Sequence, residues 1–121
     1  PQSLLAGLET AYMLEGYKRK IACLADMLEL GANEEELHRE IGEKIDSQKL
    51  DYILFYGPLA QNMYEASLKN FPNTRSVYFA HKDDLIENLK SLIIPCSLVF
   101  VKGSHGMHME EVIESIKNFK L

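Results

Sequence analysis

The segment from Lys102 to Met107 holds the residue types best suited to binding chemistry. Its six residues are Lys102, Gly103, Ser104, His105, Gly106 and Met107. A helical pattern begins near Met107 or His108, and the free backbone N–H groups at a helix N-terminus attract anions. Together with the Lys102 ammonium, this predicts a site for a carboxylate or a phosphate. The alternative is a plain strand-to-helix turn in which glycine serves only the backbone angles, and the residues alone leave both open.

The segment does not match a phosphate-cradling Walker loop. That motif is G-x-x-x-x-G-K-[ST], with the lysine after the second glycine, whereas Lys102 precedes Gly103. No other stretch matches it, and a G-x-G-x-x-G dinucleotide fingerprint is absent after the first apolar run. Nucleotide chemistry would therefore need parts that these 121 residues do not contain.

Acidic residues also follow an apolar run. Asp26 and Glu29 stand in a segment that ends at Gly31. Carboxylates in such a place can hold a substrate ammonium or a magnesium ion, while the alternative is that Asp26 only caps the turn. The run Glu34–Glu36 is typical of a solvated helix start, where the dipole favours negative charge.

The histidines give weaker signals. His105 and His108 have a spacing that can chelate a metal, but no cysteine or further histidine lies nearby to complete a zinc set, so no metal site is predicted. His38 lies at the edge of an apolar stripe, where a packed, hydrogen-bonded role is favoured over that of a general base. His81 is interpreted as a turn residue. Ser104 and His105 are adjacent, which points their side chains apart, so no hydrolase triad and no catalytic residue is predicted.

Four short apolar segments are expected to form the strands that position these groups. They span residues 21–24, 52–56, 76–79 and 98–101. Their nearly continuous apolar character is typical of parallel strands covered on both faces. Helical patterns precede the first strand and follow each strand, and Asn33 with Glu36 predicts a capping box. The order predicts an α/β fold, namely a Rossmann-like, mostly parallel sheet flanked by helices on both faces in a single domain.

Ligands of such sheets bind at the carboxyl ends of the strands. Four loops are therefore expected to open on one edge, and they comprise residues 25–31, 57–58, 80–82 and 102–107.

Composition excludes several classes of protein. A net charge of -5 argues against nucleic-acid binding. No apolar run reaches the roughly 20 residues that span a bilayer, and no signal-peptide pattern opens the chain, so a cytoplasmic location is expected. Cys23 and Cys96 are expected as reduced core thiols. The chain begins with Pro1, which indicates a removed initiator or a piece of a longer protein.

Two stretches together resemble the third domain of the bacterial Mur ligases. The first is RKIACLADMLELG at 19–31 with ELHREIG at 36–42, and the second is VKGSHGM at 101–107 followed by Met109-Glu110. The likeness covers essentially the whole chain and is greatest to the dipeptide-adding branch of the family, whose preceding segment ends in a proline like Pro1.

The chain departs from the family pattern at three places. Ala25 stands where the family usually has glycine, Cys96-Ser97 where it has a glycine–aspartate turn, and His105 where it has arginine. Histidine lacks the permanent charge and forked geometry of arginine.

The resemblance implies that residues 1–121 are the C-terminal domain of a three-domain, ATP-dependent ligase of peptidoglycan precursor synthesis, and that the domain alone is inactive. The other domains would bind UDP-N-acetylmuramoyl-tripeptide, ATP and Mg²⁺. This domain would bind D-alanyl-D-alanine, whose amine attacks the acyl phosphate, and would close over ATP. By position, the implied substrate-binding residues are Lys102, Gly103, Ser104, His105, Gly106 and Met107, with Asp26 and His38 as second choices.

Two alternatives remain at this point. One is a Mur ligase that adds a single amino acid. The other is a receiver-like, non-enzymatic α/β signalling module, which shares the alternation, an aspartate after the first strand and a lysine after the last.

Overall fold

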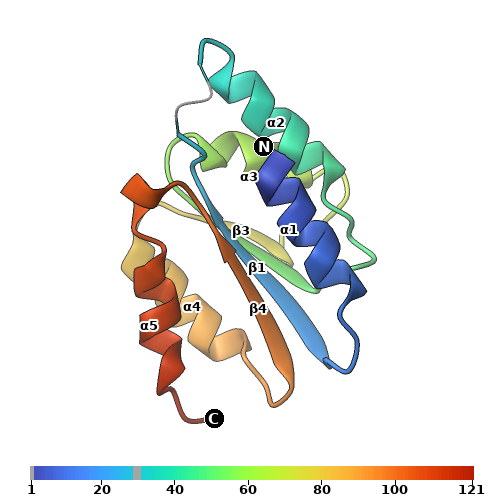
Figure 1. Cartoon of the computed structure of the whole chain (residues 1–121), viewed down its shortest axis with the longest axis vertical. Coiled ribbons are helices and arrows are strands. Elements are labelled where there is room, and N and C mark those ends of the chain that lie inside the picture. Colours follow the sequence, from blue (N-terminus) through green and yellow to red (C-terminus); the bar gives the residue numbers. More distant parts are fainter. Residues whose placement is uncertain (1, 29–30) are drawn as a thin grey trace.

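Helices and strands alternate along the chain (Figure 1). The computed structural model describes residues 2–28 and 31–121, so Pro1, Glu29 and Leu30 lie outside the described residues. The elements are α1 (Gln2–Met13), β1 (Arg19–Ala25), α2 (Glu34–Lys44), β2 (Tyr52–Tyr56), α3 (Ala60–Ser67), β3 (Ser76–Phe79), α4 (Lys82–Leu92), β4 (Ser97–Lys102), the 3₁₀ helix η1 (His105–Met107) and α5 (Glu110–Lys117). The predicted order, one helix and then four strand–helix units, is confirmed.

The four strands form one sheet in the order β3-β2-β1-β4, and every neighbouring pair is parallel. This confirms the predicted α/β class. The central strands are buried, as their continuous apolar pattern predicts: the last five residues of β1 and the middle of β2 are inaccessible to solvent or nearly so. β3 and β4 are the edge strands, and β4 is only half-buried along its length.

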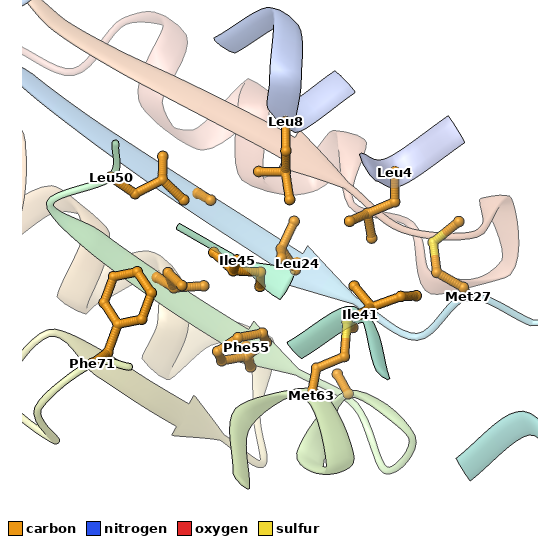
Figure 2. Packing of buried hydrophobic residues seen from close by; sticks show 13 residues of the cluster. Leu4, Leu8, Leu24, Met27, Ile41, Ile45, Leu50, Phe55, Met63 and Phe71 are labelled. Atoms are coloured by element: carbon orange, nitrogen blue, oxygen red, sulfur yellow. The ribbon is translucent and has the colours of Figure 1, made fainter. Parts of the chain in front are cut away.

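Helices cover both faces of the sheet. Ala22 and Leu24 of β1 join a core with α1, α2 and α3, which Figure 2 shows from close by. Ile21, Cys23 and Ala25 of the same strand pack on the other face with residues of α4 and with Met109 and Val112. The alternation of side chains along a strand thus serves two separate cores.

Two predictions about helix starts are wrong. Asn33 stands at the N-cap of α2, but its side chain makes no capping hydrogen bond, and the Glu36 carboxylate pairs with Arg39 at 2.9 Å instead of closing a capping box. The last helix does not begin at Met107 or His108, because η1 and a left-handed His108 (φ 51°) separate the loop from α5.

The two cysteines differ in environment. Cys23 is fully buried, as predicted, and burial raises the pKa of its thiol to about 12. Cys96 is exposed rather than in the core, because it occupies a turn with φ 67° before β4. The Ser97 hydroxyl closes this turn, since it donates to the Ile94 carbonyl at 2.7 Å and accepts the Ile94 N–H at 3.0 Å.

Among the described residues, no helix is both long enough and apolar enough to cross a bilayer.

Replacement of Cys96 by glycine should stabilise the chain. A left-handed backbone costs a residue with a Cβ about 1–2 kcal/mol, and glycine loses about 0.5–1 kcal/mol more entropy on folding than alanine. Cys96→Gly should therefore raise the free energy of unfolding in urea by about 0.5–1 kcal/mol. Cys96→Ala is the control, because it removes the thiol and keeps the Cβ. Equal stabilisation by both would show that the turn backbone is not the cause.

Candidate functional site

Residues from all four strand ends meet at one edge of the sheet, as predicted. Asp26 follows β1, Gly57 follows β2, Lys82 opens α4 after β3, and Lys102 ends β4. β1 and β4 are hydrogen-bonded neighbours with Leu24 opposite Lys102, so the loops that follow these two strands lie side by side.

Asp26 caps a helix that is distant in sequence. Its side chain is 2 % exposed, and Oδ1 accepts the N–H of Ala60, the first residue of α3, at 2.7 Å. Leu59 at the N-cap position supplies no side-chain acceptor, so the carboxylate from the β1 loop takes that role at the favourable end of the helix dipole. A Cβ on Gly57 (φ 113°) would lie within 2.4 Å of Oδ1, so glycine is required there.

Ser104 joins the loops that follow β1 and β4. Its backbone N–H donates to the Asp26 carbonyl at 2.9 Å, and its hydroxyl accepts the Leu28 N–H at 2.5 Å. The two hydrogen bonds run in opposite directions between the loops, so they fix both position and orientation. Ser104 is therefore held as an acceptor in a backbone network and not as a nucleophile beside a base.

His38 cross-links the β1 loop to α2. Its ring is fully buried, and Nε2 accepts the Met27 N–H at 2.9 Å. Since Nε2 is the acceptor, Nδ1 carries the proton and donates to the Glu34 carbonyl at 2.6 Å. Both nitrogens of a neutral imidazole are thereby used, which is the packed role favoured from the sequence.

Lys102 supplies positive charge beside this network. Its side chain is half-buried, and its ammonium has no hydrogen-bond or ion-pair partner within residues 2–28 and 31–121. A hollow of about 340 Å³ opens beside it, and Ser104 and His105 also line a second one of about 260 Å³. The first is lined by residues 101–105, Met109, Glu110 and Ile113, and the second by Leu28, Ser104, His105 and Gly106.

The N-terminus of α5 lines the first hollow through Met109 and Glu110. Its first turn carries the carboxylates of Glu110 and Glu111, whose negative charge opposes the positive end of the helix dipole. Attraction for an anion therefore rests on Lys102.

His105 and His108 have ring centroids 6.1 Å apart, and no group of three or more potential metal ligands occurs in the described part of the chain.

Two further residues contribute at this edge. The sequence placed Lys82 in the loop 80–82 without a role, and Tyr78 was not predicted to take part. Lys82 donates to the His108 carbonyl at 3.0 Å and pairs with Glu111 at 2.5 Å. The Tyr78 hydroxyl donates to the Gly57 carbonyl at 3.1 Å, and burial, reinforced by the Asp26 carboxylate, raises the pKa of Tyr78 and keeps it a donor. The only sequence signal was their position at a strand's carboxyl end.

Comparison with known proteins places this geometry in a family. The family model described as "Mur ligase, glutamate ligase domain" matches residues 1–105. The chain is 36% identical over 116 residues to the UDP-N-acetylmuramoyl-tripeptide–D-alanyl-D-alanine ligase of Bacillus subtilis, covering 96% of this chain and 25% of that protein. It is 33% identical over 123 residues to the enzyme of the same name from Haemophilus influenzae, with the same coverage.

A solved structure of MurF from Acinetobacter baumannii has the same fold, with a TM-score of 0.82 and 24% identity over 98% of this chain and 26% of that one. The chain thus spans about a quarter of the length of the relatives that it matches. The resemblance seen in the two loop motifs is confirmed, and the chain belongs to the Mur ligase family as a domain of the Mur ligase C-terminal type.

Proposed function

We propose that this chain is the C-terminal domain of a ligase that joins D-alanyl-D-alanine to UDP-N-acetylmuramoyl-tripeptide in the bacterial cytoplasm. The observation that carries the proposal is the match of 96% of the chain to relatives named for that reaction. On this proposal, residues 1–121 form one domain, and two further domains of the same enzyme are its partners.

The loop of residues 102–107 is assigned to the incoming dipeptide. The ammonium of the half-buried residue Lys102 is suited to the terminal carboxylate of a peptide, because a charge-assisted hydrogen bond is about twice as strong as a neutral one. A Cβ on Gly103 would lie 2.9 Å from the Cβ of Ala25 and 3.0 Å from Cγ of Met109, so glycine lets the loop pass closely over the end of β1. Asp26 and His38 serve binding indirectly, by holding the loops against which Ser104 rests.

ATP is proposed to bind mainly through parts that this chain does not carry, and this domain closes over it. The sequence has no Walker motif, and the described residues hold no cluster of metal ligands for Mg²⁺. ATP and Mg²⁺ are accordingly assigned to the other domains. This chain would bind the acceptor dipeptide and exclude water from the reaction centre.

The two alternatives are less well supported. A receiver-like module needs a carboxylate in the middle of the sheet, whereas β2 and β3 lead into Gly57 and Ala80, and membership of the Mur ligase family excludes that class. A ligase that adds a single amino acid would differ from the proposed enzyme in its acceptor substrate. Ligation of D-alanyl-D-alanine but not of free D-alanine would separate the two.

Loss of the Lys102 ammonium should weaken binding of the dipeptide. In the full-length enzyme, Lys102→Ala should raise the KM for D-alanyl-D-alanine about 10- to 100-fold, since hydrogen bonds to charged groups contribute about 1.5–3 kcal/mol. Steady-state ligation at varied dipeptide concentration measures this. Lys120→Ala is the control, because that exposed lysine lies at the opposite end of the last helix from the loop. An unchanged KM in Lys102→Ala would remove the assignment.

Loss of the Ser104 hydroxyl should loosen the loop without unfolding the domain. Ser104→Ala leaves the Leu28 N–H without its acceptor, so kcat/KM for the dipeptide should fall about tenfold while the circular dichroism spectrum stays unchanged. Ser115→Ala is a matched control, since that hydroxyl bonds only to Val112 within α5. Equal kinetics in both variants would contradict the role of Ser104.

The 121-residue chain alone should not hydrolyse ATP, even with both substrates present. The phosphate motif that the reaction needs is absent from its sequence. A phosphate-release assay, with the full-length enzyme as positive control, measures this. Turnover by the isolated chain would show that the division into domains is wrong.

A further inference from the structure

The Lys102–Met107 loop has a second attachment that comes from α4. The side chain of Lys82 is 14% exposed, and its ammonium donates to the His108 carbonyl at 3.0 Å. The same ammonium pairs with the Glu111 carboxylate and lies 5.6 Å from the centre of the Tyr56 ring. Three groups, from the end of β2, from His108 and from the first turn of α5, thus contact one cation that is mostly shielded from solvent.

His108 adopts a backbone conformation that needs support. Its φ of 51° and ψ of 45° lie in the left-handed region, which residues with a Cβ rarely occupy. This residue turns the chain from η1 toward α5, because its N–H still bonds to the His105 carbonyl at 3.1 Å while α5 starts two residues later. The hydrogen bond from Lys82 holds the carbonyl of that strained residue.

Only three residues separate the two attachments. Ser104 fixes the loop to the segment after β1, and His108 is fixed to α4 through Lys82. His105, Gly106 and Met107 lie between, as the turn η1. A short segment held at both ends keeps its side chains in place before a ligand arrives, which lowers the entropic cost of binding.

The geometry points to Lys82 as a positioning residue that sets the dipeptide-binding loop through His108. Lys82 is not placed in contact with the dipeptide, because its ammonium already has its partners in the carbonyl and the carboxylate. The inference rests on the proposed function for the effect on ligation, whereas the effect on the loop backbone stands without it.

The test uses the full-length enzyme with Lys82→Met, Lys82→Arg and the double variant Lys82→Met/His108→Gly. Amide hydrogen exchange at Met107 and His108 reports the turn, and ligation kinetics report dipeptide binding. We expect faster exchange and a KM for D-alanyl-D-alanine raised about tenfold in Lys82→Met, with kcat changed much less. Lys82→Arg should keep exchange and KM near their native values, since arginine can donate to the carbonyl and the carboxylate. Glycine at 108 should restore part of the loss, because it adopts the left-handed conformation without strain.

Lys69→Met is the matched control, since Lys69 forms a salt bridge with Glu43 away from this edge. Native exchange and native KM in Lys82→Met would overturn the inference, and so would a loss that neither arginine nor the glycine background relieves. Faster exchange with an unchanged KM would confirm the support of the turn but overturn its part in binding. If Lys102→Ala leaves KM unchanged at the same time, the assignment of the loop to the dipeptide fails instead.

Discussion

The arrangement of this sheet edge depends on the buried carboxylate of Asp26. A charge removed from water must be compensated by hydrogen bonds or by opposite charge, and Asp26 meets this demand at the N-terminus of α3 through the Ala60 N–H. That contact fixes the segment after β1 against α3. The carbonyl of the same residue then receives the Ser104 N–H, so the position of the β4 loop follows from the position of Asp26. Gly57 is the matching requirement, because no side chain fits beside the carboxylate.

The sheet could be predicted from the sequence, while the contacts at its edge could not. Continuous apolar runs alternating with helical patterns determine a parallel sheet, and the carboxyl-end rule then places four loops on one edge. The prediction of a helix cap from the local sequence was wrong. Asn33 has the right residue type at the right position, but the cap that matters joins Asp26 to Ala60, 34 residues further along. The bond from Leu28 to Ser104 spans 76 residues, and no local pattern encodes it.

The loop of residues 102–107 is better described as a segment that hydrogen bonds fix at both ends than as an anion-binding helix start. The 3₁₀ turn and the left-handed His108 separate it from α5 along the chain, and the first turn of α5 brings negative charge to the hollow beside Lys102. Lys102 then supplies the positive charge of the loop, and the exposed His105 lies close to it in the chain. This division agrees with the proposed role, in which the domain holds a small zwitterionic acceptor and leaves phosphate chemistry to other domains.

Asp26 couples the loops after β1 and β4 through its carboxylate and its carbonyl. Residue-resolved amide hydrogen exchange in Asp26→Ala tests this coupling directly, with Asp51→Ala as control, because the Asp51 carboxylate also accepts a backbone N–H, that of Lys20, at the opposite end of the sheet. We expect faster exchange at both Ala60 and Ser104 in Asp26→Ala and native exchange at both in Asp51→Ala. Faster exchange at Ala60 with native protection at Ser104 would show that the two loops are not coupled through Asp26.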